Sequence, residues 1–164
     1  MKDKLTAVIP VRKGSQRVKN KNLKKFFKKN LLIYKIQILK KIKHIDKIII
    51  NTDSDKAIKI AKDYNVDFFK REKYFASSKC SNSDFWSHVG KTTKSEYIMF
   101  TNCTSPLIKE KNYIDIIDCF IKNKNTYDSF NTVSLIKEYL YLNKKPLNFK
   151  IGKTPNSQDL PNIF

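Results

Sequence analysis

The chain is poor in the residues that interrupt regular structure, with 3 glycines and 5 prolines among 164 residues. This scarcity excludes collagen-like chains and chains made mainly of linkers. No apolar run approaches the roughly 20 residues that a membrane-spanning helix needs. The apolar stretch near the N-terminus meets Pro10 and Arg12 too early to form a secretory signal. We therefore expect a cytoplasmic protein that has no contact with membranes.

Cysteine is also scarce, and its three positions are far apart: Cys80, Cys103 and Cys119. They form no CxxC pair, and neither His44 nor His88 lies at metal-ligand spacing from them. An odd number of cysteines without an export signal is typical of free thiols in a reducing compartment. We expect Cys103 and Cys119 to be small buried apolar residues, and we predict no zinc site.

Arginine is rare although the chain is strongly basic. The formal net charge is +19, from 34 Lys and Arg against 15 Asp and Glu, and only three of the cations are arginine. Proteins that read base edges favour arginine for its planar, two-pronged donor array. Lys, Ile and Asn share A/T-rich codons, so a biased genome explains much of the charge. A lysine-rich nucleic-acid-binding domain without catalytic activity remains the alternative hypothesis, and an acidic substrate such as a nucleotide fits either view.

The pattern of apolar residues predicts alternating strands and helices. With 40% hydrophobic residues, the chain can bury the core of one domain, residues 1–164. Continuous apolar strands that alternate with helices predict an α/β, Rossmann-like fold with a mostly parallel sheet flanked by helices. We expect strands at 5–11, 47–52, 66–69, 97–101 and 129–136, and helices at 31–42, 57–64, 84–92 and 113–121.

The region after about Tyr141 is rich in turn residues and has no clear periodicity. The chain reaches Phe164 without a closing strand or helix. We therefore expect a fold truncated at its C-terminus, the N-terminal portion of a longer one.

The loop after the first strand is the most informative segment. Ligands of open parallel sheets gather beyond the carboxyl ends of the strands, where the loop of residues 12–22 begins. This loop contains Gly14, the hydroxyl of Ser15 and the cations Arg12, Arg17 and Lys21. Such a loop can surround a polyphosphate with backbone N–H groups and charge-assisted hydrogen bonds. It matches neither GxxxxGK[ST] nor GxGxxG, so the known kinase and dinucleotide motifs are absent.

Four motifs in order resemble one known family. Ile9-Pro10-Val11-Arg12-Lys13-Gly14-Ser15-Gln16-Arg17, closed by Lys21-Asn22, resembles the N-terminal signature of the acylneuraminate cytidylyltransferases, also called CMP-sialic acid synthetases. Ile50-Asn51-Thr52-Asp53-Ser54 resembles the second strand and "STD" turn of the family. Phe69-Lys70-Arg71 with Phe75-Ala76-Ser77 resembles its "RP..LA.." segment, and residues 102–107, NCTSPL, resemble its "QPTSPL".

The resemblance implies a nucleotide-diphospho-sugar transferase fold and a nucleotidyltransferase reaction. CMP is transferred from CTP to the anomeric hydroxyl of a sialic-acid-like (nonulosonic) sugar, and pyrophosphate is released. By similarity, Arg12 and Lys21 act on the phosphates as catalytic residues. The residues expected to bind substrate are Pro10, Val11, Gly14, Ser15, Arg17, Asn22, Arg71, Ser83, Asn102 and Thr104. Asn102, in place of the usual glutamine, would face the acceptor sugar, and Arg71 would lie at the cytidine.

The resemblance also implies Mg²⁺ and a homodimer. The aspartates of the family that bind the metal, and much of its dimer interface, lie in a segment beyond residue 164. We therefore expect no metal ligands in this chain and the dimerisation region to be missing. The chain is then either a CTP-dependent cytidylyltransferase or an inactive or incomplete copy of one.

For several residues the sequence leaves two interpretations open. Asp53 is equally a helix N-cap and a substrate contact. Ser83 competes with Ser78 for the family's base-contacting hydroxyl. We expect His88 to be a half-buried helix residue rather than a catalyst, because no orienting partner is near it in sequence. Phe85 and Trp86 are expected in the core.

Overall fold

Four parallel strands form the central sheet of the first part of the chain. The computed structural model describes residues 4–15 and 18–164, in two units that meet at Ile121 and Lys122. The sheet of the first unit has the order β5-β4-β1-β6, from β1 (Leu5–Val11), β4 (Lys47–Thr52), β5 (Asp67–Lys70) and β6 (Tyr97–Phe100). This arrangement confirms the predicted α/β fold with a parallel sheet flanked by helices.

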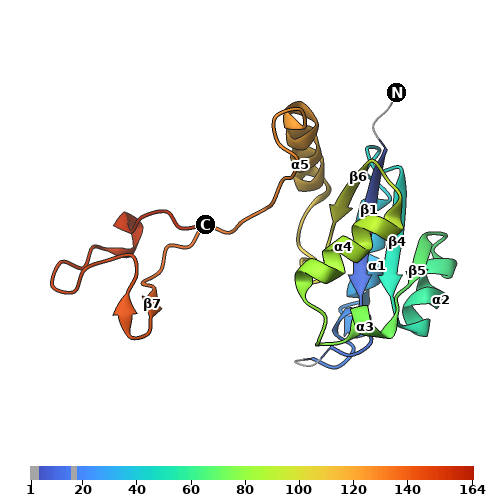
Figure 1. The fold of residues 1–164 in the computed structure, drawn as a ribbon, viewed down its shortest axis with the longest axis horizontal. Coiled ribbons are helices and arrows are strands. Elements are labelled where there is room, and N and C mark those ends of the chain that lie inside the picture. The colour runs from blue at the N-terminus through green and yellow to red at the C-terminus, as the bar shows by residue number, and fades with distance from the viewer. Residues whose placement is uncertain (1–3, 16–17) are drawn as a thin grey trace. The chain divides into compact units, whose positions relative to one another are not determined.

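The helices that connect the strands lie close to their predicted ranges. The chain leaves β1 through a loop, a short 3-10 helix and a small hairpin, and later connections are helical. The elements are η1 (Lys21–Leu23), β2 (Lys25–Phe26), β3 (Lys29–Asn30), α1 (Leu31–Leu39), α2 (Asp55–Asp63), α3 (Lys73–Ala76), α4 (Asn82–Thr93) and α5 (Glu110–Asn123). In Figure 1, α4 crosses in front of the sheet and α1 lies behind it.

Local sequence explains where these helices begin. The Asn30 side chain accepts a hydrogen bond from the backbone N–H of Ile33, 2.9 Å away, and starts α1. Ser81 caps α4 by accepting from the N–H of Asp84 at 3.0 Å. Ser54 is the N-cap of α2 but makes no side-chain capping bond.

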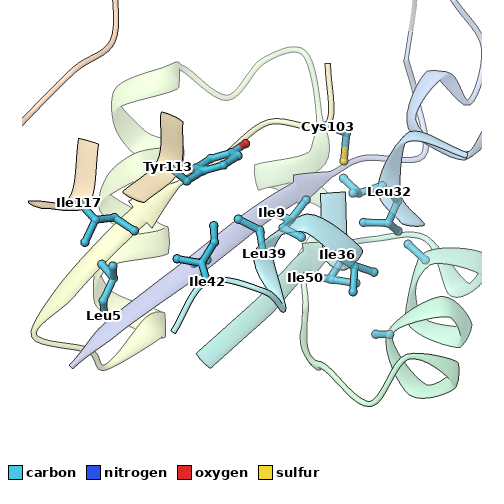
Figure 2. Packing of buried hydrophobic residues seen from close by; sticks show 14 residues of the cluster. Leu5, Ile9, Leu32, Ile36, Leu39, Ile42, Ile50, Cys103, Tyr113 and Ile117 are labelled. Atoms are coloured by element: carbon cyan, nitrogen blue, oxygen red, sulfur yellow. The ribbon is translucent and has the colours of Figure 1, made fainter. Parts of the chain in front are cut away.

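The hydrophobic core lies between the sheet and the helices α1, α2 and α5. Ile9 and Ile50 project from neighbouring strands and are fully buried. They pack in one cluster with Leu32 and Ile36 of α1 and with Ile117 of α5, as Figure 2 shows. Burying a side chain of this size contributes about 1.5–3 kcal/mol, so this face supplies most of the stability of the first unit.

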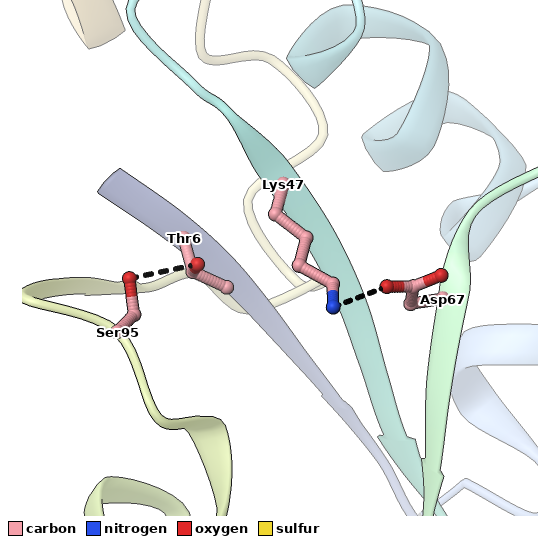
Figure 3. Close-up of polar contacts among 4 residues, drawn as sticks. All are labelled: Thr6, Lys47, Asp67 and Ser95. Carbon is pink, nitrogen blue, oxygen red and sulfur yellow. Dashed lines mark hydrogen bonds and ion pairs between the residues drawn. The ribbon is translucent and has the colours of Figure 1, made fainter. Parts of the chain in front are cut away.

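At the amino edge of the sheet, where the strands begin, the side-chain contacts are polar (Figure 3). Lys47 at the start of β4 forms an ion pair of 2.6 Å with Asp67 at the start of β5, and both side chains are more than half exposed. The hydroxyl of Thr6 donates a hydrogen bond of 2.9 Å to the hydroxyl of Ser95, which precedes β6. These contacts hold the strand beginnings together far from the loops that follow the strands.

The second unit, Lys122–Phe164, has little regular structure. It contains the hairpin of β7 (Tyr141–Leu142) and β8 (Lys145–Pro146), and the 3-10 helix η2 (Ser157–Asp159). Asn143 and Lys144 both have positive φ, as the tight turns of two-residue hairpins require. This agrees with the turn-rich character of its sequence.

Four sequence predictions are wrong in detail. Residues 129–136 form no strand, and only Ile136 makes an isolated bridge, to Ile163. Trp86 is 56% exposed rather than in the core, since α4 turns it away from the sheet. Cys119 is exposed on α5. Phe85 is half-buried and lies against Arg71 rather than in the core cluster.

Within the described residues, no helix is both long and apolar enough to pass through a membrane.

Candidate functional site

The carboxyl ends of the strands bring the predicted site segments together. β1 lies between β4 and β6: the chain passes from β1 to β4 on one side of β1, and the connection after β5 crosses back to β6 on the other side. Such a switch point is where ligands bind in open α/β sheets. The register pairs Pro10 with Asn51 and Val11 with Thr52, so β1 and β4 end side by side.

The loop after β1 is fastened to the loop after β4. The backbone N–H of Lys13 donates to Oδ1 of Asp53 at 2.8 Å. Asp53 therefore makes a loop-to-loop bond, which neither reading of its sequence anticipated. Arg12 and Ser15 are half-buried, and Gly14 is exposed. A Cβ at Gly14 would meet no heavy atom within 4 Å, so packing within the chain does not demand glycine there.

A tight turn fixes the other end of this loop. Asn20 is left-handed (φ 53°), and its carbonyl accepts the N–H groups of Leu23 and Lys24, each at 2.9 Å. Lys21 and Asn22 form the 3-10 turn η1 and are half-buried. Oδ1 of Asn22 is buried and has no hydrogen-bond partner among the described residues. A buried acceptor without a partner costs free energy.

Arg71 follows β5 and is a buried cation. Only 6% of its surface is exposed. Its Nε donates to Oδ1 of Asn51 at 2.6 Å and its Nη2 donates to the Asn51 carbonyl at 2.7 Å. Its guanidinium carbon lies 4.3 Å from the centre of the Phe85 ring. This planar contact and the two bonds fix the direction of the guanidinium.

Positive charge gathers around Arg71. Burial lowers the pKa of Arg71 from 12.5 to about 10; Asp53 raises it, and Arg12 lowers it further. Arg12 therefore lies close enough to repel the buried guanidinium. With the pKa at about 10, Arg71 is charged at neutral pH. Two arginines next to a switch point form a local positive field that suits an anionic ligand.

The loop after β6 lies beside the loop after β1, on the side away from β4. Asn102 and Thr104 are exposed, whereas Cys103 between them is 1% exposed and packs in the core. Burial raises the pKa of the Cys103 thiol to about 12, and the charges of Lys35 and Lys21 lower it. Lys21 of the first loop is therefore near the loop after β6. Cys103 is the small buried residue that the sequence predicted.

The remaining predicted residues lie as follows. Val11 is buried, so only its backbone can meet a ligand, and Pro10 is half-buried. Ser83 is exposed in the first turn of α4, two residues before Phe85, and its competitor Ser78 is exposed in the preceding loop. Arg17 lies outside the described residues.

Sequence reasoning missed three contributors to this edge. Asn51 was read only as part of a motif, although its place opposite Pro10 puts it at the strand end. Phe85 was assigned to the core but stacks on Arg71. Lys35 was not distinguished from the other lysines, yet it is 3% exposed. A lysine within an apolar helix face, between Leu32 and Ile36, was the available signal.

His88 is half-buried, as expected, and stacks on Phe75 with ring centroids 3.7 Å apart. Among the described residues, no group of three or more His, Cys, Asp or Glu side chains could hold a metal ion. Asp53 is a single carboxylate and is already bonded to Lys13. The residues present therefore do not fit a protein-held Mg²⁺ site, because such sites need several oxygen ligands.

Comparison with known proteins gives concordant matches. A family model described as cytidylyltransferase matches residues 6–155. An N-acylneuraminate cytidylyltransferase of Escherichia coli O18:K1:H7 (strain RS218 / NMEC) is 31% identical over 121 residues, covering 73% of this chain and 29% of that protein. A Helicobacter pylori (strain ATCC 700392 / 26695) protein, "Pseudaminic acid cytidylyltransferase and UDP-2,4-diacetamido-2,4,6-trideoxy-beta-L-altropyranose hydrolase", is 26% identical over 166 residues, 96% of this chain and 32% of that protein.

A solved structure of a cytidylyltransferase from Leptospira borgpetersenii serovar Hardjo-bovis (strain JB197) has a TM-score of 0.60 and 24% identity, covering 74% of this chain and 50% of that one. This likeness confirms the fold that the motifs predicted. The chain spans about a third of the length of the two curated relatives, with coverages of 29% and 32%.

Proposed function

The chain belongs to the cytidylyltransferase family, and from that premise we propose that it binds CTP and takes part in the transfer of CMP to a nonulosonic acid. The proposal is supported by the placement of Arg12 and Lys21 in the loop after β1 and of Arg71 directly after β5, at the carboxyl ends of parallel strands. A triphosphate carries enough negative charge to offset the repulsion between these cations.

In the proposed reaction, the anomeric hydroxyl oxygen attacks the α-phosphorus of CTP, and the bond to pyrophosphate breaks. Reactions of this type depend on positioning and on stabilisation of charge, with little covalent work for the protein. Arg12 and Lys21 hold the phosphates and stabilise the leaving pyrophosphate. Ser15 and the backbone at Gly14 add hydrogen bonds to the phosphate oxygens, and Arg17, by the motif alone, adds charge.

The cytidine is proposed to lie between β1 and Arg71. The backbone of Pro10 and Val11 meets the base edge, Asn22 helps to hold the loop and the nucleotide, and Ser83 approaches from the start of α4. Arg71 is held rigidly by Asn51 and Phe85, so it offers a preset donor at low entropic cost.

The acceptor sugar is proposed to face Asn102 and Thr104, which are exposed beyond β6. Relatives named for N-acylneuraminate and pseudaminic acid support the nonulosonic class. Mg²⁺ would neutralise phosphate charge in this chemistry. Because the described residues do not form a metal site, we assign no step to the ion. Homodimer formation and a cytoplasmic location stay predictions.

A thermal-shift experiment tests the proposal. With Mg²⁺ present, CTP should raise the melting temperature more than ATP or GTP does, because ligands that bind the folded state stabilise it. Arg12→Ala should abolish the CTP effect. Lys13→Ala is the matched control, since Lys13 is exposed and its bond to Asp53 uses the backbone.

An unchanged CTP shift in Arg12→Ala would refute the assignment of the phosphate loop. Tight binding to arbitrary DNA that falls steeply with salt, with no CTP effect, would favour the nucleic-acid hypothesis instead.

A further inference from the structure

Lys35 lies in the interior of the first unit. It belongs to α1 and is 3% exposed, next to Ile36, which is fully buried. Its Nζ donates to the Ser105 carbonyl at 3.3 Å and to the Tyr113 hydroxyl. The ammonium also lies 5.0 Å from the centre of the Tyr113 ring. The two hydrogen-bond partners are neutral, so the charge is stabilised by dipoles and by an aromatic ring rather than by a carboxylate.

The contacts of Tyr113 extend this network to β6. Its hydroxyl forms a hydrogen bond of 3.1 Å with Oγ1 of Thr101, which is itself buried. Tyr113 comes from α5 and packs in the same core cluster as Cys103, as Figure 2 shows. One chain of polar contacts therefore joins α1, α5 and the loop after β6.

The two contact points on this loop enclose the residues proposed to face the sugar. Thr101 and Ser105 are fixed by side chains from α5 and α1, and Cys103 is anchored in the core. Asn102 and Thr104 alternate with these anchors and are exposed. The direction of the Asn102 and Thr104 side chains therefore depends on how firmly residues 101, 103 and 105 are held.

Stability alone does not explain a lysine at this place. Burying an ammonium is costly, and an aliphatic side chain of similar volume is often neutral or stabilising at such a position. The neighbours of Lys35 on the buried face of α1, Leu32, Ile36 and Leu39, are all apolar. A buried polar network is expected to fix one conformation at the expense of some stability.

We propose that Lys35 and Tyr113 are positioning residues that hold residues 101–105 in the conformation that presents Asn102 and Thr104 to the acceptor. The proposal rests on the proposed function, because that function assigns the acceptor to this loop. The nucleotide side of the edge, at Arg12 and Arg71, is not part of this network.

The test measures ¹⁵N relaxation of the full chain in the parent and in five variants. Lys35→Met and Tyr113→Phe should lower the backbone order parameters of residues 102–105 from the rigid range of about 0.85 to below about 0.6. Residues 5–11 should stay rigid. Tyr113→Phe keeps the ring and removes only the hydroxyl, so it reports on the network even if Lys35→Met folds poorly.

Lys40→Met is the matched control, because Lys40 is an exposed lysine near the end of α1 that donates to the Tyr64 carbonyl. It should leave 102–105 rigid. At position 101, the network predicts that residues 102–105 stay rigid in Thr101→Ser and become mobile in Thr101→Val, because only serine keeps the hydroxyl.

Order parameters at 102–105 that stay rigid in Lys35→Met and Tyr113→Phe, or that are already low in the parent chain, would overturn the proposal. The CTP-induced rise in melting temperature serves as the separate readout and should persist in both variants. If the parent chain shows no CTP effect, the proposed function fails, while the relaxation data still decide whether Lys35 and Tyr113 hold the loop.

Discussion

The two edges of the central sheet hold polar side chains in opposite ways. At the amino edge, Lys47 and Asp67 form an ion pair that is more than half exposed. At the carboxyl edge, Arg71 and Asn51 are almost completely buried and bonded to each other. An exposed pair contributes little, because water screens it, whereas a buried charge is costly unless every partner is in place. The carboxyl edge is therefore the one where the chain gives up stability to hold a charge in a fixed direction.

The largest loss of stability is expected when Arg71 loses its hydrogen-bond partner Asn51. Asn51→Leu keeps the branched outline of the side chain but leaves a buried guanidinium without its side-chain acceptor, so the free energy of unfolding should fall by about 3 kcal/mol. Chemical denaturation of the variant measures this loss. Asp67→Asn at the other edge is the control and should cost far less. Equal losses at the two edges would mean that Arg71 is more hydrated than its burial indicates.

Much of the carboxyl edge could be predicted from the sequence, because a strand and the charged residues that follow it lie in one continuous segment. The loop of residues 12–22 directly follows an apolar run, so one segment contains both the strand and the charged residues that follow it. Arg71 was found through its motif. Its partner Asn51 and the stacking residue Phe85 come from distant segments, and only the strand register and the path of α4 bring them together.

The second unit shows where sequence reasoning fails. Residues 129–136 contain β-branched and apolar residues, and this composition predicted a strand. Most of the segment is exposed, and Val133 and Leu135 are more than half exposed. A strand needs a neighbouring strand to satisfy its backbone groups, and only Ile136 has a bridge partner here, Ile163. Composition reports the propensity of a segment but not whether a partner strand is available.

A smaller loss of stability is expected when the buried cation keeps its charge but changes its shape. Arg71→Lys retains a positive charge but cannot reproduce the paired bonds to Asn51 or the planar contact with Phe85. We expect a loss of stability of about 1–2 kcal/mol and a CTP-induced melting shift that is strongly reduced. Thermal melting with and without CTP measures both. A full CTP shift in Arg71→Lys would show that charge alone is sufficient at this position.

A pH-dependent effect follows from Cys103 behind the carboxyl edge. Burial raises the pKa of its thiol from 9.0 to about 12 in the folded chain. Between these values the unfolded chain loses this proton and the folded chain keeps it, so stability falls as the pH rises. The contribution is at most about 1.4 kcal/mol per pH unit. Cys103→Ala should therefore make the decline between pH 9 and 11 shallower.

The exposed Cys119 provides the control for this prediction, because Cys119→Ala should leave the alkaline slope unchanged. Denaturant unfolding at several pH values measures the slopes. The same slope in Cys103→Ala and in the parent chain would contradict burial of this thiol.

The smallest effect is expected at the amino edge. Lys47→Met removes the ion pair with Asp67, but both side chains are more than half exposed. The free energy of unfolding should change by less than about 1 kcal/mol, and the difference should shrink as salt is added. A loss comparable with that of Asn51→Leu would remove the distinction between the two edges.

The central claim is that the carboxyl edge around β1 binds the nucleotide, and a crystal structure with CTP tests it most directly. The account predicts density for the triphosphate in the loop of residues 12–22, with Arg12 and Lys21 on its oxygens and the base near Arg71. Phosphates bound elsewhere on the chain, with Arg12 and Lys21 pointing into bulk solvent, would contradict it.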